Sequence, residues 1–146
     1  MRHLLGNDSF AAFEEVLYLA TKFECDLVLL AGDLFHDNRP SRRTLHKTLE
    51  ILRKYVMGNS KAIQIQILSD QQTNFQSGIV NYQDESYAID LPIFSIHGNH
   101  DDPSRDPGSK DLLAALDLLS VTNLVNYFGR HDDIDKVRTN RNDEEA

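Results

Sequence analysis

The chain has 146 residues, enough for a single domain with a hydrophobic core. Hydrophobic residues make up 40% and charged residues 26%, the usual balance of a soluble globular protein. The formal net charge of −8 argues against nonspecific coating of nucleic acid. It does not exclude a nuclease, because metal ions in a carboxylate-rich site supply the positive charge that binds phosphate. The sequence has no run of about 18 apolar residues to predict a membrane span, and no apolar signal region to indicate export.

The first predicted elements are a helix and a strand. A polar residue among positions 7–9 can cap the helix, and apolar residues then recur at helical spacing to about Lys22. The uninterrupted aliphatic run 27–31 predicts a strand covered on both faces, as in a parallel sheet. The only cysteine, Cys25, excludes an internal disulfide and fits a reducing compartment. We expect it to be buried between helix and strand.

The middle of the chain predicts a second helix, a strand and a long loop. Residues 41–57 place leucines on one helical face and Arg and Lys on the others, and Gly58 ends this helix. In residues 63–67, isoleucine alternates with glutamine, the pattern of a half-exposed strand. Residues 69–86 are polar, and a loop this long in a compact domain is usually functional or mobile.

The last third of the chain predicts two more strands around a third helix. The run 93–96 follows Pro92, which suits only the start of a strand because it has no N–H. Leucines at helical spacing predict a helix over 111–120, and 124–128 is a short strand. Residues 131–146 are polar and expected to be disordered. The alternation of helices and strands predicts an α/β layered domain, although it opens with a helix where a doubly wound sheet opens with a strand.

Two of these strands end in residues suited to a metal or phosphate site. Asp33 and His36 follow the first strand, and Asn99 and His100 follow the strand over 93–96. Open α/β sheets bind ligands beyond the carboxyl ends of their strands, and Gly98 allows a turn that lets the next two side chains converge. Carboxylate and amide oxygens suit manganese or magnesium, while imidazole widens the choice to zinc and iron.

The same residues also have ordinary structural interpretations. Asp33 can cap the turn that follows its strand, residues 99–100 can form a hydrogen-bonded turn, and His36 can lie on a surface turn. Asp101 and Asp102 either orient the preceding histidine or cap the following turn, and the sequence does not choose between these roles.

Two segments, AGDLFHDNRPS and IHGNHDDP, resemble the calcineurin-like metallophosphoesterases and, more closely, the meiotic-recombination-eleven nucleases of the double-strand-break repair complex. The resemblance is specific because many other segments agree in sequence and order, namely GNDSF, LRKYVMG, ILSDQQTNF, VNYQDE and ALDLLSVTNLVNYFGR. It covers about residues 6–130. It implies a partial phosphoesterase (nuclease) domain over 1–130, followed by the polar tail 131–146.

The resemblance also implies roles for the site residues. In the family, two manganese ions, Mn(2+), lie between strand ends, and Asp33 matches the aspartate that bridges them. Asn99 matches an amide ligand of one ion. His100 matches the histidine that stabilises the pentavalent phosphorus or protonates the leaving oxygen, and His36 matches a histidine near the scissile phosphate. The implied reaction is hydrolysis of DNA phosphodiesters in the nucleus, by 3′-to-5′ exonuclease and endonuclease action.

The resemblance further implies protein partners. Helices corresponding to 41–57 and 111–120 form a homodimer interface in these nucleases, although here their leucines can instead cover the sheet of the same chain. The loop 69–86 matches an insertion that contacts nibrin. The repair complex also contains a coiled-coil SMC-like ATPase subunit, which binds through regions mostly absent here.

Several family motifs have no match in this sequence. An Asp-x-His motif should precede Gly6, where His3 lacks the aspartate, and later histidine motifs should lie beyond Arg130, where only His131 occurs. We therefore expect an incomplete phosphoesterase fold, without its first strand and C-terminal half, that is inactive alone. The rival interpretation is a non-catalytic module that dimerises or binds nibrin. Another small metallophosphoesterase is disfavoured by the insertion 69–86.

Overall fold

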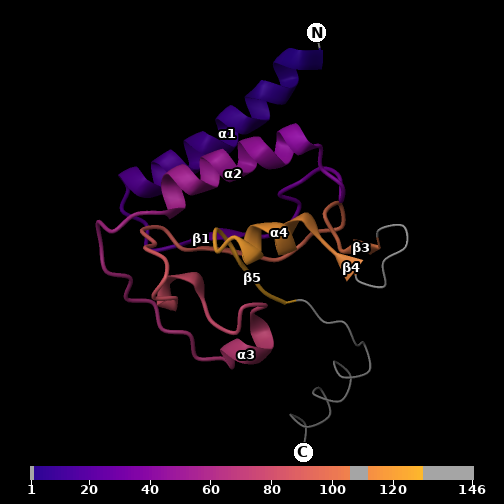
Figure 1. Cartoon of the computed structure of the whole chain (residues 1–146). Helices are drawn as coiled ribbons and strands as arrows, with labels where there is room; N and C mark the ends of the chain where they lie inside the picture. Colours follow the sequence, from indigo (N-terminus) through magenta and orange to yellow (C-terminus); the bar gives the residue numbers. More distant parts are fainter. Residues whose placement is uncertain (1, 106–111, 130–146) are drawn as a thin grey trace, which may run out of the picture.

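The structure is a computed structural model and describes residues 2–105 and 112–129. The tail 131–146, for which the sequence predicts disorder, lies outside the described residues. The elements in chain order are α1 (Arg2–Lys22), β1 (Val28–Leu30), α2 (Arg42–Val56), α3 (Gln71–Asn74), the 3-10 turn η1 (Asn81–Gln83), β2 (Ile93–Ser95), β3 (Ser104–Arg105), β4 (Leu112–Leu113), α4 (Ala115–Val121) and β5 (Asn126–Tyr127) (Figure 1). None of the helices in the described ranges has the length and apolar character needed to cross a bilayer.

The centre of the fold is a parallel sheet with the strand order β1-β2-β5. Val28 is paired with Ile93 and Leu30 with Ser95, while Ser95 is also paired with Tyr127. Strand β2 is central and fully buried, as its apolar sequence requires. The predicted α/β class is confirmed, because helices connect parallel strands and cover their sheet. The strands β3 and β4 form a separate antiparallel pair.

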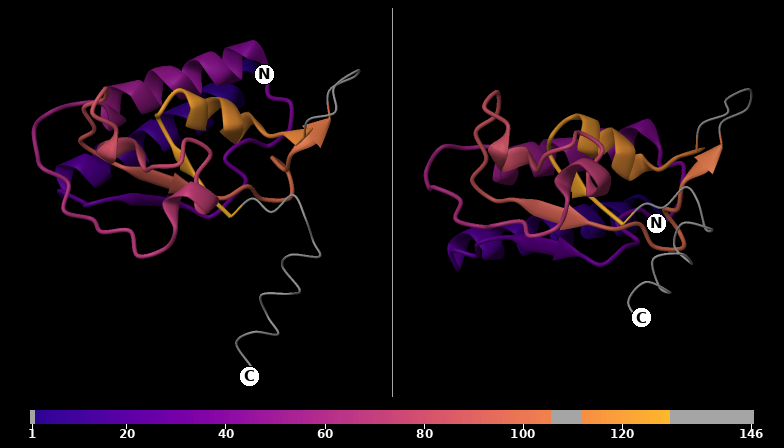
Figure 2. Two further views of the ribbon diagram at one scale, coloured as in Figure 1. Left: turned by 60° about the horizontal axis from the view of Figure 1, so that its bottom comes forward. Right: turned by 90° about the horizontal axis from the view of Figure 1, so that it is seen from below.

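Helices α1, α2 and α4 cover one face of the sheet, and α1 lies alongside α2 (Figures 1 and 2). Their buried apolar side chains join those of Ile93 and Tyr127 in one core cluster, with Leu17 from α1, Leu52 and Val56 from α2, and Leu116 and Leu119 from α4. The leucine stripes of the two predicted helices therefore cover the sheet of their own chain.

The other face of the sheet is covered by the long loop between α2 and β2. Phe75 and Val80 of this loop pack against Phe94 of β2 in a second apolar cluster. Hydrogen bonds fasten the same loop to β5: the N–H of Asn81 donates to Asn126 Oδ1 at 2.7 Å, and Asn126 Nδ2 donates to Asn81 Oδ1 at 2.9 Å. The loop is thus a structural part of the domain, because it covers a face of the sheet.

Two predicted helices, α1 and α4, begin at clearly different residues in the structure. Helix α1 begins at Arg2 and continues through positions 7–9, so the predicted cap there is wrong. Good helix formers before Gly6 favour the earlier start, and one glycine costs a helix only about 1 kcal/mol. Helix α4 begins at Ala115, because Leu112 and Leu113 are paired with β3 as a strand.

Three further predictions are wrong because of missing or different neighbours. Residues 63–67 keep alternating exposure but form no strand, since no described strand lies beside them to complete a hydrogen-bonded ladder. Leu29 is 68% exposed although a fully covered strand was predicted, because it lies outside the apolar cluster that the loop forms with Phe94. Cys25 is exposed in the turn between α1 and β1.

Replacing Asn126 by alanine should lower the free energy of unfolding by about 1–3 kcal/mol. Asn126 is only 4% exposed, and its loss leaves the N–H and side-chain oxygen of Asn81 and the carbonyl of Ile93 without this partner. Urea denaturation measures the change. The matched control is Asn59→Ala at an exposed position, which should stay within about 0.5 kcal/mol of the unaltered chain. Equal stability of both variants would contradict the structural role of the asparagine pair.

Candidate functional site

Two loops meet at the carboxyl edge of the sheet. The β1 loop (residues 31–36) follows β1, and the β2 loop (residues 96–102) follows β2, its parallel neighbour. The backbone N–H of His100 donates to Asp33 Oδ1 at 2.9 Å, and Asn99 directly precedes this histidine. The side chains of Asp33, Asn99, His36 and His100 are all exposed. The structure therefore brings together, at one accessible edge, the four residues that the sequence singled out.

The two loops can approach this closely because each has a glycine at the contact. A Cβ on Gly32 would lie 2.8 Å from the Cα of Gly98, and a Cβ on Gly98 would overlap the carboxylate of Asp33. Asp33 itself has φ +54°, a conformation that is uncommon for a residue with a side chain. Such backbone conformations persist where surrounding contacts hold them.

Asp101 makes the most buried contact between the two loops. Its side chain is 0% exposed, and Oδ1 accepts the N–H groups of Asp33 at 3.2 Å and Gly98 at 2.6 Å. Oδ2 accepts the N–H of Phe35 at 3.4 Å. The sequence did not decide whether Asp101 orients His100 or caps a turn. The hydrogen bond from the N–H of Gly98 lies within the turn of the β2 loop. The other two N–H donors, however, belong to the β1 loop, 66 and 68 residues away in the sequence.

The two candidate histidines lie against each other. The rings of His36 and His100 are stacked, with centroids 5.2 Å apart and an interplanar angle of 19°. A cavity of about 620 Å³ adjoins them, and its lining also includes Phe10, Phe13 and Asp33. Two imidazoles that each offer a donor and an acceptor nitrogen suit contact with a phosphate group.

His97 has a packing role at the same edge. Its Nδ1 lies 2.7 Å from the hydroxyl of Tyr127, so it connects the exit of β2 to β5. This contact joins the third strand to the edge that carries the candidate residues. The sequence offers no signal for this contact, because Tyr127 lies 30 residues away in β5.

The donor types at this edge fit a hard divalent cation. Among the described residues, only Oδ1 of the Asp33 carboxylate accepts a hydrogen bond, so Oδ2 can bind a cation. Asn99 adds an exposed amide oxygen. Within residues 2–105 and 112–129, however, no group of three or more His, Cys, Asp or Glu side chains could hold an ion. The described residues therefore supply part of a coordination shell.

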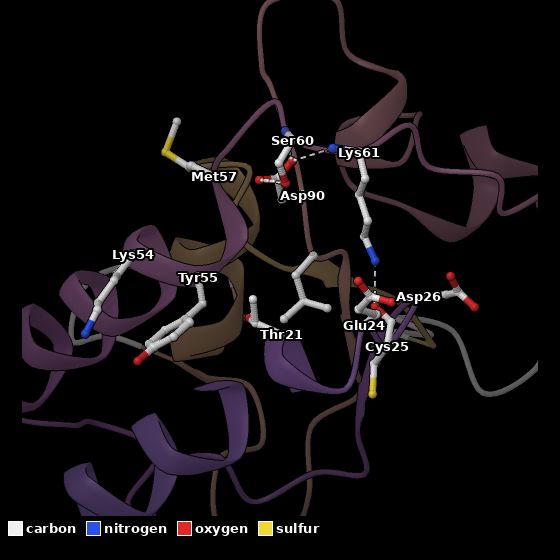
Figure 3. A pocket seen from close by; sticks show the side chains of 11 residues that line it. Thr21, Glu24, Cys25, Asp26, Lys54, Tyr55, Met57, Ser60, Lys61 and Asp90 are labelled. Atoms are coloured by element: carbon white, nitrogen blue, oxygen red, sulfur yellow. Dashed lines mark hydrogen bonds between the residues drawn. The ribbon is translucent and has the colours of Figure 1, made fainter. Parts of the chain in front are cut away.

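A second cavity, of about 560 Å³, lies at the opposite end of the strands (Figure 3). Lys61 Nζ donates to the carbonyl of Cys25 at 2.7 Å there, and Asp90 accepts bonds from the N–H and hydroxyl of Ser60, each at 2.7 Å. Burial raises the pKa of Asp90, but the hydrogen bonds from Ser60 and the N–H of Lys61 outweigh this effect and hold the pKa below its ordinary value. Asp90 thus joins the end of α2 to the start of β2.

Comparison with known proteins identifies the family. The sequence profile of the calcineurin-like phosphoesterases matches residues 3–145. The chain belongs to the calcineurin-like phosphoesterase family. Its α/β fold agrees with the metallophosphoesterase domain expected from the sequence, and members of such a family use divalent metal ions.

Several proteins named for double-strand break repair are closely similar to this chain. It is 52% identical over 135 residues to "Double-strand break repair protein MRE11" of Mus musculus and to the protein of that name from Homo sapiens. It is 53% identical over 126 residues to the protein of that name from Arabidopsis thaliana. These matches cover 90%, 90% and 85% of this chain, but only 18%, 18% and 17% of the relatives. The chain thus spans less than a fifth of their length.

Replacing Gly98 by alanine should weaken divalent metal binding about tenfold or more, because the new methyl group displaces the carboxylate and backbone of Asp33. Isothermal titration with Mn²⁺ measures the affinity. The control is Gly78→Ala, where φ is +75° but nothing lies within 4 Å, so this variant loses stability without touching the site. If both variants keep the affinity of the unaltered chain, Gly98 does not determine the position of Asp33.

The lowered pKa of Asp90 predicts a pH dependence of stability. The ionised carboxylate stabilises the fold above the pKa of an unfolded aspartate, about 3.9, and this contribution is lost as the pH falls through the lowered pKa. Asp90→Asn should therefore flatten the decline of stability between about pH 5 and pH 2, measured by urea denaturation. An unchanged pH profile would show that the bonds from Ser60 and Lys61 do not favour the ionised form.

Proposed function

We propose that residues 1–130 are part of a manganese-dependent DNA nuclease domain that hydrolyses phosphodiesters in double-strand-break repair. The observation that carries the proposal is the meeting of Asp33 and the Asn99–His100 turn at one sheet edge, in a chain of a phosphoesterase family. Similarity to proteins named for double-strand break repair supports DNA as the substrate and the nucleus as the location. Exonuclease action in the 3′-to-5′ direction and endonuclease action belong to the same proposal.

Each candidate residue has a role that suits its chemistry. Asp33 and Asn99 would hold metal, since both present oxygen donors and the amide adds no charge to repel phosphate. Bound ions of this kind activate water and neutralise phosphate charge. His100 and His36 would contact the phosphate, because their stacked rings are exposed beside Asp33. An imidazole N–H can stabilise the charge on phosphate oxygens or donate a proton to the leaving oxygen near neutral pH.

The chain alone is proposed to have negligible nuclease activity. Asp33 and Asn99 supply two of the roughly six donors that a manganese ion prefers, and water in the other positions does not fix the site. The phosphate and the attacking water are then poorly positioned, and positioning can lower a barrier by about 7–11 kcal/mol. In the larger assembly, nibrin at the loop 69–86 and the coiled-coil SMC-like ATPase are the proposed partners.

A non-catalytic module is the alternative function. Leu52 of α2 and Leu116 and Leu119 of α4 are buried in the chain's own core, but Leu118 and Val121 of α4 are 48% and 70% exposed. These side chains favour an interface on α4 through which two copies would form the homodimer. The metal distinguishes the two functions, because the nuclease site needs ions and a dimerisation or nibrin-binding module needs none.

Manganese titration of the chain tests the proposed site. Mn²⁺ should bind weakly, Asp33→Ala should abolish the binding, and His100→Asn should leave it unchanged because His100 is assigned to the phosphate. Isothermal titration measures all three, with Asp37→Ala at an exposed position as the control carboxylate. Labelled duplex DNA incubated with the chain and Mn²⁺ should remain uncut.

The catalytic role of His100 can be tested only in a protein that cleaves DNA. In a longer chain that carries the family's further motifs, His100→Asn should lower the cleavage rate by about 10²–10⁴-fold while manganese stays bound, as expected when a general acid is lost. Loss of manganese from this variant would assign His100 to the metal instead. Tight binding of two ions and DNA turnover by the present chain would overturn the proposal that it is inactive alone.

A further inference from the structure

The carboxylate of Asp101 lies where it can control the geometry of the candidate site without touching a ligand. It is fully buried beneath the two loops, while the residues assigned to metal and phosphate are exposed. Its three hydrogen-bond donors are all backbone N–H groups, from Asp33, Phe35 and Gly98. A buried carboxyl group needs such donors, and the two oxygens of Asp101 accept all three of them.

The hydrogen bonds between the two loops are reciprocal. Asp101 of the β2 loop accepts N–H groups from Asp33 and Phe35 of the β1 loop, and Asp33 accepts the N–H of His100 in return. The N–H of Asp33 thus points inward to Asp101 while its carboxylate points outward to the backbone of His100. At φ +54°, Asp33 has an uncommon backbone conformation, and this inward bond holds it there.

We propose that Asp101 is a positioning residue that sets the distance between Asp33 and the Asn99–His100 turn, and so the affinity of the site for a divalent metal ion. The proposal rests on the proposed function for the metal-binding role of Asp33 and Asn99. Both side-chain oxygens of Asp101 are needed as acceptors, Oδ1 for the N–H groups of Asp33 and Gly98 and Oδ2 for that of Phe35. Asparagine has the same size, but its NH₂ group would face an N–H donor.

The test compares Asp101→Asn with Asp102→Asn, which removes the exposed carboxylate next to it. Titration with Mn²⁺ should show affinity about 10–100-fold lower for Asp101→Asn, the usual effect of losing a residue that supports a metal ligand, and unchanged affinity for Asp102→Asn. Ile51→Val in the core lowers stability away from the site and should keep full affinity, which separates positioning from general destabilisation. Equal affinity of Asp101→Asn and Asp102→Asn would overturn the proposal and leave the proposed function standing.

A second measurement uses the unaltered chain without metal, so it does not depend on whether a variant folds. In the unaltered chain, NMR should detect scalar couplings across the hydrogen bonds from the amide nitrogens of Gly98 and Asp33 to the carboxyl carbon of Asp101. The three amide protons should also exchange with solvent at least tenfold more slowly than that of the exposed Asp102. Absence of the couplings and of this protection would overturn the proposal. If the couplings are present but no Mn²⁺ binding depends on Asp33, the proposed function fails while the contact between the loops stands.

Discussion

The contact between the β1 and β2 loops depends on one buried carboxylate. Asp101 has no described cation beside it; three backbone N–H groups balance its charge instead. Hydrogen bonds to a charged group are stronger than those between neutral groups, and they are strongest where water is excluded. Asp33 itself is exposed, and its Oδ1 accepts the N–H of His100.

The parallel pairing of β1 with β2 makes that contact possible. The two strands end in the same direction, so the loops that follow them start side by side at one edge. Gly32 and Gly98 then allow the backbones to approach to a distance at which side-chain carboxylates reach across. The contact between the two loops is therefore made by backbone N–H groups and two short Asp side chains.

The long loop between α2 and β2 has a structural role as well as a proposed partner. Phe75 and Val80 cover Phe94 on one face of the sheet, and the Asn81–Asn126 bonds hold the loop against β5. A partner that binds this loop would thus contact an element packed on the central strand. Leu29, on the same face but at the sheet edge, is left exposed by the loop.

The sequence by itself determined the helices and strands of the core, the α/β class and the four candidate residues. These depend on local periodicity and on motifs read within a few residues, as in the apolar run before Gly98. Only the tertiary structure decided the hydrogen-bond partners of Asp101, the packing of the leucines on their own sheet and the exposure of Leu29 and Cys25. The partners of Asp101 lie 66 and 68 residues away, and burial depends on which segment covers a face. No local sequence pattern predicts these hydrogen bonds or this burial, because the residues that form the bonds and cover the sheet come together only after folding.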